Sequence, residues 1–162
     1  GGFLHDIGKV GIPDAILFKR GRLTEAEWET MRIHTTRGEE ICCRMKTLAP
    51  VLPIIRSHHE RWNGSGYPDG LRENEIPLLA RILQVADIYD ALTTARPYKP
   101  AYTPEHAVQV LLDETQRGWR DPELVALFAD LTRKGLPEVA AESPSATGTR
   151  QSLDALRLEL IR

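Results

Sequence analysis

The residues most able to do chemistry in this sequence are histidines and aspartates from several separate stretches of the chain. Two adjacent pairs stand out, His5-Asp6 and His58-His59, and the wider set takes in four of the five histidines. Imidazoles and carboxylates in proximity can hold two divalent metal ions and leave coordination positions open. The sequence therefore predicts a metal centre. Its candidate ligands are His5, Asp6, His34, His58, His59 and Asp87.

The positions of these residues favour their convergence. Neighbouring residues of a helix project about 100° apart, so an adjacent pair can converge on one ion or bridge two. Asp87 falls in the apolar stretch 83–88, where a carboxylate is costly unless it is paired or bound to metal. Asp90 follows on the same helix face and is predicted to accept a hydrogen bond from a ligand histidine. We expect the six candidate side chains to surround one small region.

Each residue taken singly also has an ordinary explanation. An isolated His-Asp pair is often just a hydrogen bond, and His34 alone would be interpreted as a helix-surface residue. His106 lies outside the set, in the first turn of a predicted helix, and is interpreted as a surface residue. Cys42 and Cys43 are adjacent and have no third cysteine, which favours helix packing in a reduced, cytoplasmic setting.

Composition narrows the class of protein. The 162 residues suffice for one domain with a core, and the hydrophobic (41%) and charged (27%) fractions are typical of a globular protein. A net charge of −2 argues against binding to duplex nucleic acid, which needs many cationic contacts to phosphate. No apolar run approaches the roughly 18 residues of a membrane span, so we expect no membrane insertion by this segment.

Local signals predict helices nearly throughout, and period-two alternation is nowhere sustained, so the expected fold is all-α. Capping residues and glycine or proline stops define the expected ranges. The expected helices cover residues 13–18, 24–45, 48–59, 78–95, 103–116 and 121–133, with an irregular loop at 61–76. Residues 138–150 are interpreted as a linker, and residues 151–162, with Leu153, Leu156 and Leu160 on one stripe, as a short frayed tail.

Four strings of residues resemble the signatures of the HD-GYP family within the HD phosphohydrolase superfamily. They are His5-Asp6-Ile7-Gly8-Lys9, His58-His59-Glu60, Gly64-Ser65-Gly66-Tyr67-Pro68 and Arg96-Pro97-Tyr98-Lys99. Several long strings in fixed order are more specific than one short pattern, and the resemblance runs from residue 1 to about residue 131. It implies an all-α HD-domain helical bundle. It also implies a metal-dependent phosphodiesterase that hydrolyses cyclic di-GMP to pGpG, and further to GMP.

The resemblance implies a role for each matching residue. The six candidates named above match the family's metal ligands, with Asp6 as the bridging, catalytic carboxylate. Lys9 matches a lysine that contacts the scissile phosphate. Gly66, Tyr67 and Pro68 match the loop at the substrate pocket, which is also implicated in partner contacts. Arg96 and Lys99 match the family's cations that hold the substrate phosphates.

Cofactors and partners follow from the same resemblance. Two divalent ions are expected, and a third where a further ligand is present. Imidazole and carboxylate ligands without a thiolate favour Fe, Mn or Ni over Zn. Cyclic di-GMP is the expected substrate. An upstream sensory or receiver domain, a protein partner at the GYP loop and a second copy of the chain are the expected protein contacts.

The N-terminus departs from the family pattern. Family members carry helices before the His-Asp pair, whereas this chain starts at Gly1, without a Met and only four residues before His5. We therefore expect a domain over residues 1–137 that is truncated at its N-terminus, followed by a linker and tail at 138–162. The missing helices would have covered apolar groups such as Leu83, Ile88 and Leu92, so the chain alone is expected to aggregate or melt early.

Two rival functions are left open by the sequence. One is another HD-superfamily nucleotide phosphohydrolase, against which the GYP loop and the Arg-Pro-Tyr-Lys string argue. The other is a regulatory module that binds cyclic di-GMP or a partner protein without catalysis, against which the complete HD and GYP strings argue. A turnover assay on a panel of nucleotides separates all three functions.

Overall fold

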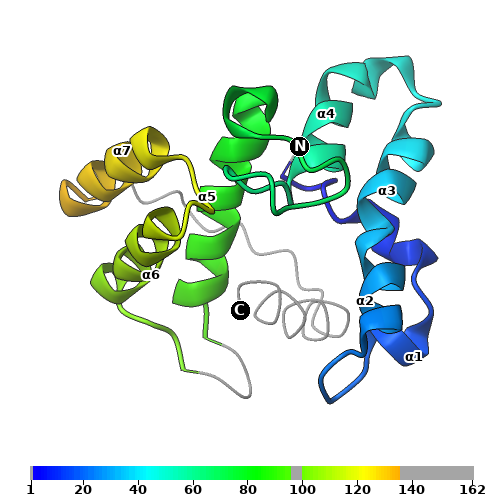
Figure 1. Cartoon of the computed structure of the whole chain (residues 1–162), viewed down its shortest axis with the longest axis horizontal. Coiled ribbons are helices and arrows are strands. Elements are labelled where there is room, and N and C mark those ends of the chain that lie inside the picture. The colour runs from blue at the N-terminus through cyan, green and yellow to red at the C-terminus, as the bar shows by residue number, and fades with distance from the viewer. Residues whose placement is uncertain (1, 96–99, 136–162) are drawn as a thin grey trace.

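The computed structural model describes residues 2–95 and 100–135, and these residues fold mainly into helices (Figure 1). The all-α prediction is confirmed. In the described ranges the only β-type pairing is one isolated antiparallel bridge between Asn63 and Arg72. The predicted linker and tail at 138–162 lie outside the described residues. The α-helices (α) and 3-10 helices (η) are η1 (Ile7–Gly11), α1 (Asp14–Leu17), α2 (Glu25–Arg32), α3 (His34–Cys42), η2 (Lys46–Val51), α4 (Leu52–Ser57), η3 (Glu73–Glu75), α5 (Leu78–Thr93), α6 (Pro104–Gln116) and α7 (Pro122–Arg133).

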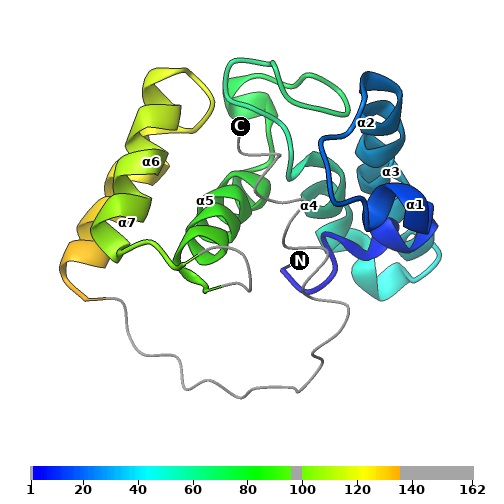
Figure 2. The ribbon, with the colours of Figure 1, turned by 90° about the horizontal axis from the view of Figure 1, so that it is seen from below.

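Helix α5 runs through the middle of the molecule between two groups of helices. Figure 1 shows the α6–α7 pair on one side of α5 and α1 to α4 on the other, and Figure 2 shows the same order from below. Helix α5 contacts α4, α6 and α7, while α3 contacts both α4 and η1. The segments that carry the candidate ligands therefore form one continuous series of contacts from η1 to α5.

Apolar residues of α5 form a core with the α6–α7 pair. The buried members of this cluster are Val85, Ile88, Leu92, Ala107, Leu111 and Val125. The expectation that Ile88 and Leu92 depend on preceding helices for cover was wrong, because α6 and α7 already bury them. Leu83, on another face of α5, is half-buried.

The expected single helix over 24–45 is instead two helices, α2 and α3, which meet at Ile33. Thr24 begins α2 as predicted, through a capping box with Glu27. At the junction, three successive backbone carbonyls bond side chains of the next turn: Met31 with His34, Arg32 with Thr35, and Ile33 with Thr36. Such bonds compete with the helical N–H groups and bend a helix. The helix is interrupted at Ile33, so His34 is the first residue of α3, which ends at Cys42, earlier than predicted.

Helices α6 and α7 begin where their capping residues predicted. Thr103 Oγ1 accepts a hydrogen bond from the N–H of His106, and the Asp121 carboxylate accepts two N–H groups from the first turn of α7. His106 is exposed, as predicted. Helix α5 ends at Thr93, and the predicted stop at Pro97 lies outside the described residues.

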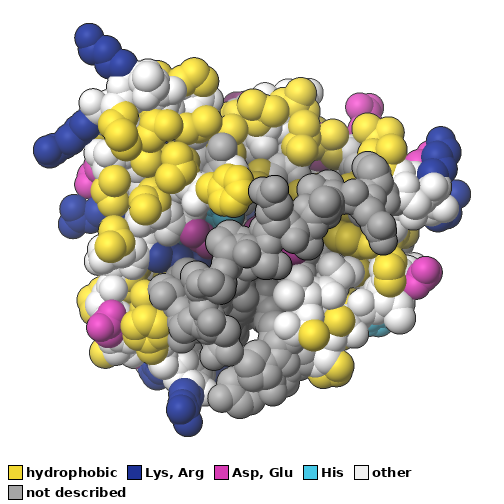
Figure 3. All heavy atoms as spheres, turned by 180° about the vertical axis from the view of Figure 1, so that it is seen from behind, with side chains coloured by type: hydrophobic (Ala, Val, Ile, Leu, Met, Phe, Trp, Pro, Cys, Tyr) yellow, Lys and Arg dark blue, Asp and Glu magenta, His cyan; other side chains and the backbone are white. Residues whose placement is uncertain are grey.

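Several large hydrophobic side chains reach the surface. Figure 3 shows hydrophobic side chains gathered on the face opposite the one in Figure 1. The exposed examples include Phe3, Val10, Leu79 and Leu127, which lie on different segments. No helix of the described ranges combines the length and the apolar character that crossing a bilayer would take.

Leu111→Ala should lower the free energy of unfolding by about 3 kcal/mol, because truncating a fully buried leucine leaves a cavity. Leu127→Ala is the matched control on α7: its side chain is 57% exposed, so its loss should stay below about 1 kcal/mol. Urea unfolding of both variants measures the difference. A similar small loss for both would contradict the placement of Leu111 in the core.

Candidate metal centre

The six candidate ligands come from four places in the fold. These are the turn before η1 (His5, Asp6), the first residue of α3 (His34), the end of α4 (His58, His59) and the middle of α5 (Asp87). The expectation that the two adjacent pairs lie within helices was wrong. One pair precedes η1 and the other follows the last residue of α4, so the chain turns at both pairs.

Two glycines let these segments approach closely. A Cβ atom on Gly8 would lie 1.8 Å from the carbonyl oxygen of His34, and one on Gly38 would lie 2.8 Å from the side chain of Ile55. Any side chain at Gly8 would therefore push η1 away from α3. The contact of these two backbones sets Asp6 beside His34.

One oxygen of Asp6 faces the histidines of α3 and α4. Asp6 Oδ1 lies 3.6 Å from His34 Nε2 and 3.7 Å from His58 Nε2, and these two nitrogens are 3.3 Å apart. With one nitrogen of His59 added, the donor atoms of the four residues all lie within 4.8 Å of one another. This first donor group is compact enough to hold a metal ion.

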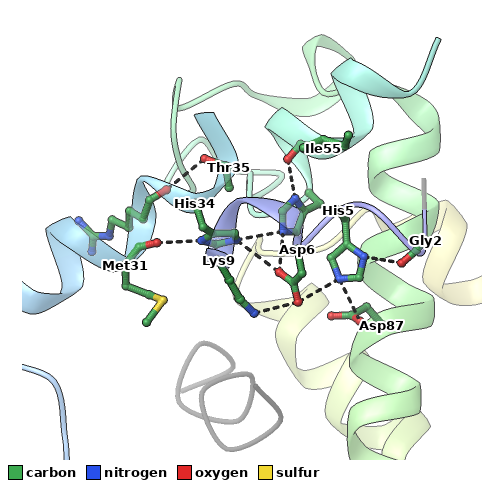
Figure 4. A network of polar contacts seen from close by, with 11 residues as sticks. Gly2, His5, Asp6, Lys9, Met31, His34, Thr35, Ile55 and Asp87 are labelled. Atoms are coloured by element: carbon green, nitrogen blue, oxygen red, sulfur yellow. Dashed lines mark hydrogen bonds and ion pairs between the residues drawn. The ribbon is translucent and has the colours of Figure 1, made fainter. Parts of the chain in front are cut away.

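The other oxygen of Asp6 faces a second donor group. Asp6 Oδ2 lies 3.4 Å from His5 Nε2, which lies 3.6 Å from Asp87 Oδ1. Figure 4 shows the Asp6 carboxylate between His34 and His5, with Asp87 next to His5. The six side chains thus meet in one region, with Asp6 between the two groups. Their roles as ligands remain a prediction.

Backbone carbonyls orient three of the histidine rings. The Nδ1 atoms of His5, His34 and His58 lie 2.7, 2.8 and 2.7 Å from the carbonyl oxygen of the residue three positions earlier (Figure 4). A carbonyl can only accept, so each of these Nδ1 atoms donates its proton and the Nε2 atom of each ring is turned toward the centre. The sequence does not reveal these acceptors, because a backbone carbonyl has no signature in the residue type.

Three other predicted residues are not placed at the centre by the described structure. Asp90 is exposed, and its carboxylate accepts a hydrogen bond from Thr94 Oγ1 at 3.3 Å. Asp90 was predicted to accept a hydrogen bond from a ligand histidine, but backbone carbonyls accept the hydrogen bonds of His5, His34 and His58. Arg96 and Lys99, predicted to bind phosphate, lie outside the described residues.

Lys9 adds a buried cation to the second donor group. Its side chain is only 3% exposed, and its ammonium donates to Asp6 Oδ2 at 2.8 Å. A charge buried this deeply needs a partner of opposite sign, which Asp6 supplies. The Lys9 ammonium thus lies at the edge of the candidate metal centre, next to the carboxylate shared by the two donor groups.

Burial and charge set the protonation states of the centre. Burial acts to raise the pKa of Asp6, but contacts with His5 and His58 and the charge of Lys9 outweigh it and lower that pKa well below its ordinary value. Burial, aided by His58 and Lys9, lowers the pKa of His34 to about 3. Burial also lowers the pKa of His58 and that of His59. At neutral pH Asp6 is therefore a carboxylate and His34, His58 and His59 are neutral imidazoles, the forms that bind metal.

This donor set fits a divalent cation. Lone pairs of Asp6, His34 and His58 that face one another repel, and a cation between them replaces repulsion with attraction. His59 Nε2 is buried and has no hydrogen-bond partner in the described part of the chain. A buried polar atom needs a partner, and a coordinated ion would provide one. Histidine and acidic side chains are also visible near the middle of the face in Figure 3.

The loop after His59 covers one side of the centre. The Tyr67 ring stacks on the His59 ring, with centroids 4.9 Å apart and an interplanar angle of 23°, and lies 6.4 Å from the His34 ring. The Tyr67 hydroxyl is buried without a hydrogen-bond partner among the described residues, and burial raises its pKa, so it is a neutral donor. Gly66 before it has no space for a Cβ atom, and Pro68 after it follows a cis peptide bond.

Comparison with known proteins identifies the family. Residues 1–124 match the family model described as HD domain. The chain belongs to the HD domain family. The match includes all six candidate ligands, and the resemblance noted in the sequence is confirmed.

Curated relatives of this HD domain chain include three from different bacteria. It is 45% identical over 135 residues to a cyclic di-GMP phosphodiesterase of Thermotoga maritima (81% of this chain, 36% of that protein). It is 48% identical over 117 residues to the cyclic di-GMP phosphodiesterase response regulator RpfG of Xanthomonas campestris (71% and 30%). It is 42% identical over 129 residues to 3′3′-cGAMP-specific phosphodiesterase 2 of Vibrio cholerae (78% and 24%). The matches thus span between 24% and 36% of the length of these relatives.

Lowering the pH from about 7.5 to about 5.5 should destabilise chelator-treated protein, with His34 alone contributing about 1.4 kcal/mol. The pKa of His34 is about 3 in the fold, against about 6.5 for an ordinary histidine. Between these values the unfolded chain binds more protons than the folded chain, so stability rises with pH. The contribution of His34 is present above the ordinary pKa and is lost as the pH falls toward 3.

Urea unfolding at the two pH values measures this loss. His34→Gln should reduce the pH dependence, because glutamine does not titrate. His106→Gln is the matched control and should keep the dependence that His34 contributes, because it leaves His34 and its surroundings unchanged. Equal pH dependence in the wild type and His34→Gln would contradict the depressed pKa.

Proposed function

We propose that this chain is the catalytic part of a metal-dependent phosphodiesterase that hydrolyses cyclic di-GMP to pGpG, and pGpG further to GMP. The observation that carries the proposal is the position of Asp6, whose Oδ1 faces His34 and His58 while its Oδ2 faces His5 and Lys9. A carboxylate shared by two donor groups suits a pair of metal ions. The names of the relatives support the substrate class.

The proposed ligands are His5, Asp6, His34, His58, His59 and Asp87. They would hold two ions, or three if a further ligand is supplied, and Fe, Mn or Ni suits this donor set better than Zn. When bound, the ions neutralise phosphate charge and lower the pKa of water. The chain's own part is to keep the donors ready, because carbonyls orient three of the rings and burial keeps His34, His58 and His59 neutral.

Lys9 would act on the phosphate. Negative charge builds on the phosphoryl oxygens as the ester bond breaks, and a cation already in place stabilises it without reorganisation. The Lys9 ammonium is buried and held 2.8 Å from Asp6 Oδ2, so its position is fixed before substrate arrives. Lys9 would therefore raise turnover without holding metal.

The substrate pocket would be completed by the GYP loop and by two cations. Tyr67, between Gly66 and Pro68, presents a buried neutral hydroxyl next to the ring of a proposed ligand. Arg96 and Lys99 are proposed to hold the substrate phosphates, Arg96 through paired hydrogen bonds.

In the whole protein we propose further parts around an HD-GYP domain at residues 1–137. Residues 138–162 would form a linker and tail. An upstream sensory or receiver domain is supported by the name of one relative, a response regulator. The GYP loop would contact a partner protein, the domain would form homodimers, and the protein would act in the cytoplasm.

A second candidate substrate is 3′3′-cGAMP, because one matched relative is named for that specificity. The metal-loaded protein should be incubated under anaerobic conditions with cyclic di-GMP, 3′3′-cGAMP and a panel of mononucleotides. Faster consumption of cyclic di-GMP supports the proposal. A preference for mononucleotides would instead indicate another HD phosphohydrolase, and binding without turnover would indicate a regulatory module.

Asp6→Ala should abolish hydrolysis and remove most bound metal, because both donor groups lose their shared ligand. Lys9→Ala should lower kcat by about 100-fold or more while metal content stays unchanged, because the ammonium acts on charge at the phosphate. Metal analysis together with the turnover assay separates the two effects.

His106→Ala serves as the control for these variants, since His106 is an exposed histidine outside the set. It should retain both metal and activity. Loss of metal in Lys9→Ala would show that the lysine supports the ligands and would contradict the role given to it here.

A further inference from the structure

Glu60 is a fully buried carboxylate directly after the two proposed ligands at the end of α4. Its relative exposure is 0%. Oε1 accepts hydrogen bonds from the N–H groups of Asp69 at 2.7 Å and Gly70 at 3.1 Å, and Oε2 accepts one from Leu71 at 3.1 Å. A buried carboxylate is costly unless such donors satisfy it. These three bonds tie the far end of the GYP loop to the segment that carries His58 and His59.

The near end of the loop is tied to the same segment. A Cβ atom on Gly66 would lie 2.4 Å from Glu60 Cα, so the two backbones are in direct contact. The N–H group of Tyr67 donates to the carbonyl of His59 at 3.2 Å. Tyr67 is therefore fixed between two anchors, both of which depend on residues 59 and 60.

Helix α5 fixes the backbone of Glu60. Gln84 Nε2 donates to the Glu60 carbonyl at 2.7 Å, and Gln84 lies three residues before Asp87. Gln84 is held in turn by Arg120, which forms a buried ion pair with Glu114 at 2.6 Å. Glu60 thus keeps a constant position relative to the proposed ligand on α5.

A second ion pair also reaches the loop but is more exposed. Arg56 on α4 pairs with Asp69 at 2.7 and 2.8 Å, and the two side chains are 34% and 35% exposed. Solvent and salt weaken a pair at this exposure. The buried Glu60 bonds are therefore the stronger restraint on the loop.

The geometry points to Glu60 as a positioning residue that holds the Tyr67 hydroxyl over the metal centre, where it donates a hydrogen bond to a phosphate oxygen of the cyclic dinucleotide. The inference rests on the proposed function and adds a residue that acts through another residue. The Glu60 carboxylate accepts N–H groups of the loop backbone, and the role given to it requires no contact with metal or substrate. Its effect on substrate binding passes through the backbone of residues 69–71 and the position of Tyr67.

Glu60→Gln tests this role in the full chain. Glutamine has nearly the size of glutamate, but an NH2 group replaces one of the two carboxylate oxygens. Because this group cannot accept a hydrogen bond, one or two of the three bonds are lost, depending on which oxygen it replaces. Amide hydrogen exchange at residues 69–71 should become faster. KM for cyclic di-GMP should rise by about 10-fold, with metal content unchanged and a smaller change in kcat.

A double-mutant cycle with Tyr67→Phe separates positioning from general destabilisation. If Glu60 acts through the Tyr67 hydroxyl, Glu60→Gln should raise KM in the wild type but add less than about 2-fold once Tyr67 is Phe. Asp121→Asn is the matched control, because Asp121 is also a buried carboxylate that accepts backbone N–H groups, at the start of α7. It should lower stability without raising KM.

Three results would overturn the inference: additive effects on KM in the cycle, loss of metal in Glu60→Gln, or unchanged exchange at residues 69–71. Wild-type protein that carries metal but neither binds nor hydrolyses cyclic di-GMP would overturn the proposed function and the substrate role of Tyr67 with it. Hydrogen exchange does not depend on activity, so it distinguishes that failure from a failure of Glu60 to hold the loop.

Discussion

The close approach of η1 to α3 is the constraint on which the metal centre depends. Gly8 makes it possible, since a Cβ atom there would fall 1.8 Å from the His34 carbonyl oxygen. With the two backbones in contact, the Asp6 carboxylate lies between α3 and the turn before η1, and each of its oxygens faces a different group of donors. Gly8 therefore has a geometric role: it allows the close approach of η1 to α3 that places Asp6 beside the histidines.

Packing these donors together is unfavourable for the metal-free fold. Burial holds His34 and its neighbours neutral, with their lone pairs turned inward by backbone carbonyls. His59 Nε2 is buried with no partner in the described ranges. A cation that binds only the folded chain offsets these costs and stabilises the fold by mass action. Metal binding and folding are thus linked, because the groups that destabilise the empty centre are the groups that would bind the ion.

Helix α5 joins this centre to the rest of the molecule. One face contributes Asp87 to the donors and Gln84 to the backbone of Glu60. Another face contributes Val85, Ile88 and Leu92 to the core with α6 and α7. A single helix therefore bears both a core cluster and one wall of the candidate site, so a change in core packing can move the proposed ligand Asp87. This arrangement explains why so apolar a helix carries a carboxylate in its middle.

The sequence by itself determined the candidate ligands, the all-α class and the starts of α2, α6 and α7. Those features follow from residue type over a few positions, as with the caps at Thr24, Thr103 and Asp121. The tertiary structure alone decided the break between α2 and α3 at Ile33, the carbonyls that orient the rings, the pairing of Lys9 with Asp6 and the bonds from the loop to Glu60. A backbone carbonyl or N–H group is the same in every residue, and its partner depends on how distant segments pack. Residue type therefore showed which groups could react, and packing decided which of them meet.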